Sequence, residues 1–468
     1  MSTVKNNFLF SIFTRFFLAI SGFISTSLIV KSLSISDFGL WNYIFAFISI
    51  ISIFALSGYG GVFNRFVAIL LAKNEKNAIF PLVTYFLKYK LLMYVLLFPI
   101  FLFLKFNLKI KLICYLIFVL YDINLYLRAS LFQSTLKYNL EFIGVIIGRL
   151  LWLIFIFILY EKNLINIKLL LYTFLLSEIS SFIIFLFFTL KFYKINVNNK
   201  IFKHFTKKDF WNYYLYSYLS SLAYFVIDTS IDKLMLKYFF SSREVGIYSA
   251  AVIIPIYIVN FFPTNILTNI LATKFIILNE KGSFNFRETI FHYMNIGFLL
   301  YLVSIILYFT FSDTLIRFIF GDKYLPFLFV FDTAFSLFCF KSFLYILAPF
   351  IQVKGLAKAY LLTYVSALLN VILNFLLIPK YNVLGAILAT GFSVIIHILF
   401  LVIYLNYKGL KMKIDYINLV IFLLILTIYL FKNIDFNLKF IIITFLFLYL
   451  LLRSISSIRW FFKLILKI

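Results

Sequence analysis

The stretch Phe142–Tyr160 reads FIGVIIGRLLWLIFIFILY, and Arg149 is its only charged side chain. An α-helix needs about 20 mainly apolar residues to cross the hydrocarbon core of a bilayer, so this stretch is long enough for one crossing. Similar apolar runs recur along the whole chain, separated by short polar breaks. The pattern predicts membrane-spanning helices rather than the core of a water-soluble domain.

The overall composition extends this prediction to the complete sequence. Of the 468 residues, 64% are hydrophobic and only 13% are charged, whereas about 45–50% apolar residues are usual in soluble proteins. Too few polar residues remain to cover such a large core in water. The composition therefore excludes a soluble enzyme, a nucleic-acid-binding protein and a disulfide-rich secreted domain. In a multi-pass membrane protein, the net charge of +26 reflects Lys and Arg in cytoplasmic loops.

The apolar runs predict an all-α protein with about 14 transmembrane helices and both termini in the cytoplasm. This orientation places more Lys and Arg in cytoplasmic loops than in outer loops, and the longest linker, Lys191–Asp209, is especially basic. The third span requires Lys88 and Lys90 to snorkel toward the headgroups. Ser312–Tyr324 is predicted as an outer loop. The predicted spans are Phe8–Val30, Leu40–Ser57, Val83–Leu104, Leu112–Leu131, Phe142–Tyr160, Leu169–Leu190, Phe210–Ile231, Val245–Leu267, Phe291–Phe311, Leu325–Leu347, Ala359–Ile378, Leu384–Leu405, Tyr416–Phe431 and Leu438–Leu452.

An internal repeat divides these spans into two halves. Lys31–Trp41 (KSLSISDFGLW) resembles Lys237–Tyr248 (KYFFSSREVGIY), and the short stretches around Gln133 and Gln352 also correspond. We expect an N-terminal six-helix lobe (residues 1–195), a C-terminal six-helix lobe (196–406), and two further helices with a cytoplasmic tail (407–468). The lobes should be related by a pseudo-two-fold axis along the membrane normal, with a cavity between them. Superposition should bring Gly39 onto Gly246 and Gln133 onto Gln352.

Three stretches resemble a known family: Asp232–Ala251, Phe320–Pro326 (FGDKYLP) and Ala367–Thr390. They are similar to the polysaccharide-biosynthesis flippases, which carry O-antigen and other oligosaccharide repeat units, of the multidrug/oligosaccharidyl-lipid/polysaccharide exporter superfamily. The resemblance implies a non-enzymatic flippase in the bacterial cytoplasmic membrane. Its substrate would be an undecaprenyl-pyrophosphate-linked oligosaccharide, used for surface polysaccharides such as lipopolysaccharide.

The resemblance also bears on partners and cofactors. It is consistent with partnership with a polysaccharide polymerase and chain-length machinery, in addition to membrane lipids and the lipid-linked substrate. We expect a monomer that needs no cofactor and binds no metal or nucleic acid.

Charged residues inside the predicted spans are the candidate functional residues, because an ionisable group in a bilayer needs a protein partner or a wet cavity. Arg15, Arg149 and Lys341 are candidate contacts for an anionic substrate, since guanidinium groups match phosphate oxygens bidentately. The superfamily's lipid flippases carry cavity arginines on the first span, which strengthens the assignment for Arg15. The alternatives are a salt bridge within the half for Arg149 and snorkelling for Lys341.

Acidic residues in the spans are candidates for binding a coupling proton or Na⁺. Asp228 and Asp232 lie near the end of the seventh predicted span, and Asp122 lies in the fourth. For Asp232 the alternative is an interfacial charge cluster with Lys233 and Lys237. Small residues have a structural interpretation, because Gly144, Gly148 and Gly385 allow close approach of a neighbouring helix.

Two rival functions remain at this point. A drug/cation antiporter of the same superfamily would favour an acidic cavity rather than the three buried basic residues found here. A membrane-embedded glycan polymerase or ligase would need a large outer loop or an acidic site for its chemistry, and no such loop is predicted. The sequence contains no G-x-x-x-x-G-K-[ST] phosphate-binding loop, so the chain is not expected to hydrolyse a nucleotide.

Overall fold

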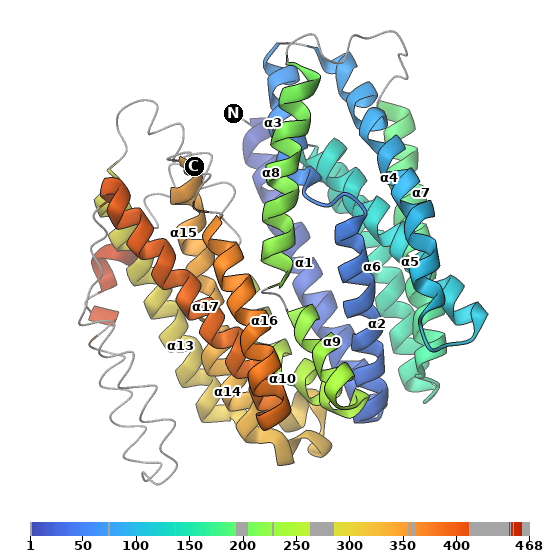
Figure 1. The fold of residues 1–468 in the computed structure, drawn as a ribbon, viewed down its shortest axis with the longest axis vertical. Helices are drawn as coiled ribbons and strands as arrows, with labels where there is room; N and C mark the ends of the chain where they lie inside the picture. The colour runs from blue at the N-terminus through green and yellow to red at the C-terminus, as the bar shows by residue number, and fades with distance from the viewer. Residues whose placement is uncertain are drawn as a thin grey trace. The chain divides into compact units, whose positions relative to one another are not determined.

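The structure is a computed structural model that describes residues 2–73, 75–135, 137–192, 205–226, 229–262, 285–353, 356, 359, 361–410, 449, 451–452 and 454–460. Within these residues every regular element is a helix, and eleven helical stretches are long and apolar enough to cross a membrane (Figure 1). The prediction of an all-α, multi-pass protein is therefore confirmed. The predicted spans Tyr416–Phe431 and Leu438–Leu452 lie almost entirely outside the described residues.

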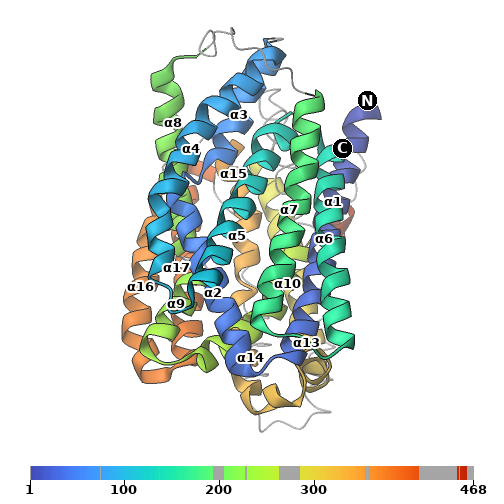
Figure 2. The same cartoon turned by 90° about the vertical axis from the view of Figure 1, so that its right-hand side faces the viewer.

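The chain divides into two compact units, Met1–Gly246 and Ile247–Ile468. In the first unit α1 packs along α6, α7 packs against both α5 and α6, α2 packs against α9, and α3 packs against α8. Figure 2 shows α1, α6 and α7 running side by side. The helices of this unit are α1 (Ser2–Ser32), α2 (Ile35–Phe54), α3 (Tyr59–Ala72), α4 (Ile79–Leu102), α5 (Leu108–Leu127), the π-helical turn η2 (Arg128–Gln133), α6 (Tyr138–Glu161), α7 (Ile167–Phe192), α8 (Lys207–Val226), α9 (Thr229–Phe239) and the first turn of α10 (Ser242–Phe261).

The second unit is built around a tight pair of helices, α16 and α17. A Cβ added to Gly385 would lie 2.2 Å from the Leu377 carbonyl oxygen, so the close approach expected at this glycine is confirmed. Asn370 Nδ2 donates to Thr390 Oγ1 across the pair at 2.9 Å. The described helices of this unit are the rest of α10, α13 (Phe286–Phe320), η3 (Asp322–Phe327), α14 (Leu328–Phe338), α15 (Lys341–Val353), α16 (Leu361–Tyr381), α17 (Val383–Leu405) and η5 (Asn406–Leu410).

Several predicted boundaries are wrong, and breaks within helices account for most of them. Helix α3 was not predicted, and it follows α2 after a short break that contains Leu56 (φ 60°) and Gly58 (φ 82°). The predicted span Phe210–Ile231 is divided between α8 and α9. Most of the predicted loop Ser312–Tyr324 is helical, because α13 continues to Phe320 and ends at Gly321, whose φ of 87° terminates the helix.

The two copies of the repeated motif contact each other through their backbones. A Cβ added to Gly39 of α2 would lie 1.7 Å from the Ser242 carbonyl oxygen, and one added to Gly246 of α10 would lie 2.0 Å from the Ile35 carbonyl oxygen. Ile35 precedes Gly39 by the same four positions by which Ser242 precedes Gly246. The contact is thus reciprocal, as in an interface with two-fold symmetry. Superposition of the two halves stays a prediction.

Substitution of Gly39 by Ala should destabilise the protein. In the middle of a helix Gly→Ala normally stabilises by about 0.5–1 kcal/mol, but here the new methyl group meets backbone atoms that cannot rotate away. We expect a loss of about 1–3 kcal/mol, as for other overpacked sites. Thermal unfolding in detergent, with Gly60→Ala as the control, measures the difference. The nearest neighbour of a Cβ at Gly60 is the Ala129 methyl group at 3.9 Å, so equal melting of the two variants would contradict the close contact.

Candidate functional site

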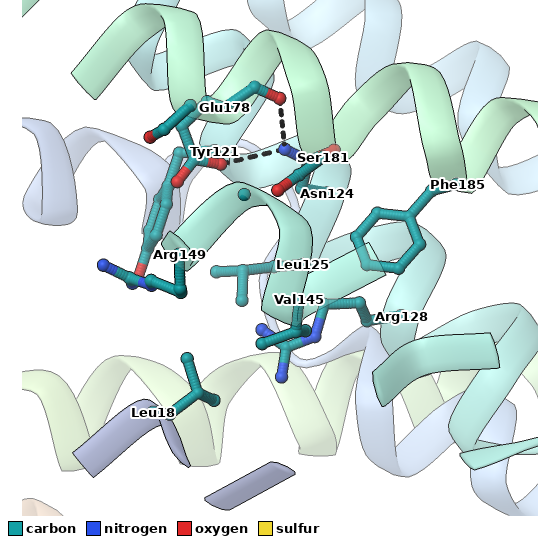
Figure 3. A pocket seen from close by; sticks show the side chains of 12 residues that line it. Leu18, Tyr121, Asn124, Leu125, Arg128, Val145, Arg149, Glu178, Ser181 and Phe185 are labelled. Carbon is teal, nitrogen blue, oxygen red and sulfur yellow. Dashed lines mark hydrogen bonds between the residues drawn. The ribbon is translucent and has the colours of Figure 1, made fainter. Parts of the chain in front are cut away.

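A polar cavity of about 390 Å³, its mouth included, lies in the unit Met1–Gly246 between α1, α5, η2, α6 and α7. Figure 3 shows Arg149 and Arg128 on the side nearer Leu18 of α1, with Glu178 and Asn124 on the opposite side. The cavity therefore combines two cationic side chains with one carboxylate inside an otherwise apolar helical unit. The lining residues are Leu18, Tyr121, Asn124, Leu125, Arg128, Val145, Gly148, Arg149, Ser177, Glu178, Ser181 and Phe185.

Glycines on α6 set the distance between α6 and α7, and so the depth of the cavity. A Cβ at Gly148 would lie 1.9 Å from Ser181 Oγ, and one at Gly144 would lie 2.2 Å from the Phe185 ring. The expected small-residue face of this span is therefore confirmed, because only glycine allows α7 so close. Arg149, the residue after Gly148, is held at the edge of this seam and lines the cavity.

Arg149 is the cationic group of the cavity that the protein leaves available. Its guanidinium makes no hydrogen bond or ion pair with any residue that the structure describes. The alternative interpretation, a salt bridge within the same half, is therefore not found among those residues. A guanidinium carries five N–H donors in a planar fork, so Arg149 can offer them to an anion or to water in the cavity.

Arg128, in contrast, is neutralised by a buried acid. Its Nε and Nη2 both donate to Glu141 Oε1, at 3.1 and 2.9 Å. Gln133 Nε2 donates to the same oxygen at 2.8 Å. Arg128 and Gln133 begin and end the π-helical turn η2, and such turns are frequent at functional sites. Glu141 thus orients Arg128 at the cavity wall and gives the repeated Gln133 motif a local role.

The acidic side of the cavity is formed by Glu178 of α7. Asn124 Nδ2 donates to Glu178 Oε2 at 2.8 Å and to the Glu178 carbonyl oxygen at 3.0 Å, as the dashed lines in Figure 3 show. Asn124 Oδ1 is buried and has no hydrogen-bond partner among the described residues. The site therefore presents both an anion-binding and a cation-binding group within one pocket.

The other predicted substrate contacts are not in the lining of this cavity. Arg15 lies one turn before Leu18 on α1 and is partly buried. Lys341 lies in the other unit at the start of α15, where its Nζ is 5.0 Å from the centroid of the Phe338 ring. Of the three predicted basic residues, the structure thus places only Arg149 in the lining.

The predicted coupling acids lie in different surroundings. Asp228 is outside the described residues. Asp232 is fully buried in α9, and its neighbour Lys233 donates from Nζ to Asn42 Oδ1 at 3.4 Å. Asp122 is buried in α5 and forms an ion pair with Lys90, with Nζ and Oδ2 2.5 Å apart.

The expectation that Lys90 snorkels toward the headgroups is wrong. Its side chain is 0% exposed and its ammonium points into the unit. The reason is its position on α4, because Phe86, Lys90 and Tyr94 follow one another at intervals of four and share the buried face. Lys88, on another face of the helix, is exposed. Helical periodicity across this span was the signal that could have revealed the buried lysine.

Arg128 was also missed, because it was counted as the end of a span rather than as part of a site. The repeated stretch around Gln133 was its only sequence signal.

No protein-family model and no curated protein sequence matches the chain. Solved structures do match. The lipid II flippase MurJ in an inward closed conformation is 19% identical, with a TM-score of 0.65 over 98% of this chain and 99% of that chain. An inward-facing multidrug resistance MATE family transporter of the MOP superfamily is 14% identical, with a TM-score of 0.61 over 86% and 99%. An outward-facing MATE transporter is 16% identical, with a TM-score of 0.55 over 86% and 97%.

These likenesses define the class of fold. The chain has the fold of MOP-superfamily transporters, and the three matching structures are named as transporters or a flippase rather than as enzymes. At such low identity the comparison assigns the fold and does not assign a substrate.

Replacement of Glu141 by Gln should destabilise the N-terminal unit. The change removes the charge that two nitrogen atoms of Arg128 share, and hydrogen bonds to charged groups contribute about 1.5–3 kcal/mol. We expect a loss of that order in urea or thermal unfolding. Glu161→Gln, at the exposed end of the same helix, is the matched control and should melt like the wild type. Equal effects of the two substitutions would show that the Arg128–Glu141 pair is not structural.

Proposed function

We propose that this chain is a flippase for an undecaprenyl-pyrophosphate-linked oligosaccharide unit, which it moves from the cytoplasmic to the outer leaflet. The observation that carries the proposal is Arg149, whose guanidinium has no hydrogen-bond or ion-pair partner among the described residues and lines a polar cavity within a membrane unit. A charged side chain in a span is costly unless it serves a wet cavity or a ligand. Supply of lipid-linked units for surface polysaccharides, such as the O-antigen of lipopolysaccharide, would be its role in the cell.

The physical requirement of flipping matches this cavity. A sugar–pyrophosphate headgroup cannot cross about 30 Å of hydrocarbon unaided, because its charged and polar groups would lose their water. Arg149 would exchange that hydration for N–H donors in a fork that fits phosphate oxygens. Seryl hydroxyl groups at positions 177 and 181 line the same pocket. The polyprenyl tail would remain in the lipid.

The remaining predicted residues enter the proposal as follows. Arg15, one turn from the cavity wall, would guide the pyrophosphate toward Arg149, and Lys341 would be an anion contact in the other unit. Asp228 and Asp232 would be the acids that bind a coupling cation during alternating access. We place the chain in the bacterial cytoplasmic membrane as a monomer with cytoplasmic termini. A polysaccharide polymerase with its chain-length machinery would be the partner.

A drug/cation antiporter is the second candidate. Glu178 supports it, because a carboxylate in the cavity could receive an organic cation, and the MATE transporters share the fold. Asn124 already donates to Glu178, however, whereas Arg149 is left available. The charge balance of the cavity therefore favours an anionic substrate. A glycan polymerase or ligase is a weaker third candidate, since the predicted outer loop Ser312–Tyr324 is largely helix.

Arg149→Ala should strongly reduce surface glycan in a flippase-deleted host that carries the variant, while membrane insertion stays normal. Arg149→Lys should retain part of the activity, because a point charge replaces the bidentate fork. Arg15→Ala is expected to have a smaller effect than Arg149→Ala. Lys162→Ala, at the exposed residue after α6, is the matched control. Surface glycan is compared with protein abundance for each variant. Normal glycan with Arg149→Ala at wild-type abundance would remove Arg149 from the site.

The proposed orientation is tested by reporter fusions. A reporter inserted in residues 193–204 should report a cytoplasmic location, because the flanking Lys191, Lys207 and Lys208 follow the positive-inside rule. A reporter next to Gly321, between α13 and η3, should report the outer side. Activity of both reporters on the same side would contradict the topology.

A further inference from the structure

Lys90 is held in a buried site that satisfies its ammonium group completely. Its Nζ lies 2.5 Å from Asp122 Oδ2 and donates to the Ala55 carbonyl oxygen at 2.7 Å. The third direction of the ammonium is covered by the Tyr59 ring, whose centroid is 4.7 Å from Nζ. The rings of Tyr94 and Tyr126, both at 5.6 Å, complete the enclosure. The site lies within the unit Met1–Gly246.

The surroundings of this ammonium are those of a cation-binding site. Ala55 is the C-cap of α2, and its carbonyl lies at the negative end of a helix that stops inside the predicted membrane region. Carbonyl groups at interrupted helices, together with a carboxylate, are the ligands that coordinate Na⁺ in transporters with broken helices. Aromatic faces add attraction for a cation. Tyr94 donates its hydroxyl to Asp122 Oδ2 at 2.6 Å, which fixes the carboxylate toward the site.

The break between α2 and α3 keeps this carbonyl group in place. Leu56 and Gly58 have positive φ angles, and Ser217 Oγ of α8 donates to the Gly58 carbonyl oxygen at 2.6 Å. A Cβ at Gly58 would lie 2.8 Å from backbone atoms of Ser217. The interrupted helix is thus fixed on one side by α8 and on the other by the Lys90 ammonium.

We propose that Lys90 is the permanent, covalently tethered occupant of a monovalent-cation site formed by Asp122, the Ala55 carbonyl and the tyrosine cage. Asp122 consequently does not exchange Na⁺ with solution in this chain, and any coupling cation must bind elsewhere. The proposal is independent of the substrate that the protein carries. It revises the role of Asp122 from a coupling acid to a fixed counter-charge.

The energetics favour this view over that of a simple stabilising salt bridge. A buried ion pair is often no more stabilising than well-packed apolar residues, but removal of one partner leaves an uncompensated charge. A variant without the ammonium would keep the carboxylate, the carbonyl and the aromatic rings. Such a vacated site should therefore accept a solution cation, and the protein should then become sensitive to Na⁺.

The test uses the purified full chain in detergent and follows thermal unfolding as NaCl replaces choline chloride at constant ionic strength. Wild type and Lys88→Met, a control at the exposed lysine of the same helix, should show no Na⁺-specific shift. Lys90→Met should melt at a lower temperature and regain part of the loss with Na⁺. Lys90→Met/Asp122→Asn should show no Na⁺ response, because the carboxylate charge is gone.

Two results would overturn the proposal. The first is a Lys90→Met protein that folds but shows no response to Na⁺, which would make the pair purely structural. The second is equilibrium binding of radioactive Na⁺ by the wild type that the double variant lacks, since Asp122 would then exchange a cation with Lys90 present. This second measurement does not depend on the folding of Lys90→Met, and its expected result is the absence of such binding.

Discussion

A charged side chain inside a bilayer must have a partner, and this constraint governs the N-terminal unit. Lys90 is matched by Asp122, Arg128 by Glu141, and Glu178 receives two hydrogen bonds from Asn124. Each match joins helices that are separate in the sequence, so the polar contacts also fix which helices are neighbours. Against this background Arg149 is the exception, since the described residues provide it with neither an ion pair nor a hydrogen bond. An exception to a costly rule is where a ligand is expected.

Close helix packing provides the frame in which these charges are placed. Glycine allows backbones to approach where the bilayer gives no hydrophobic drive for helix association. Gly148 brings α7 against α6 and sets the wall of the cavity. Gly39 and Gly246 bring the two copies of the repeated motif into reciprocal contact. The frame and the site are therefore coupled, because a shift of α7 would change the distance between Arg149 and Glu178.

Hydropathy was sufficient to predict the helical membrane fold and most of the spans, because about 20 apolar residues are a strong signal. It could not locate the interruption after α2, since Leu56 and Gly58 differ from their neighbours in backbone angle rather than in polarity. Arg149 was found because a lone charge in an apolar run is conspicuous. Lys90 and Arg128 were misjudged, since each lies near a polar break and its partner is distant in the sequence. Such pairings arise from tertiary packing, which hydropathy does not encode.

The central claim is that the cavity serves an anionic lipid headgroup, and a transport assay on the purified protein tests it most directly. Proteoliposomes would contain a fluorescent polyprenyl-pyrophosphate-linked oligosaccharide, and a membrane-impermeant quencher would report how much of it lies in the outer leaflet. The account predicts protein-dependent movement of this lipid between leaflets and no uptake of an organic cation such as ethidium. Uptake of the cation without movement of the lipid would contradict the account and identify the chain as a drug/cation antiporter.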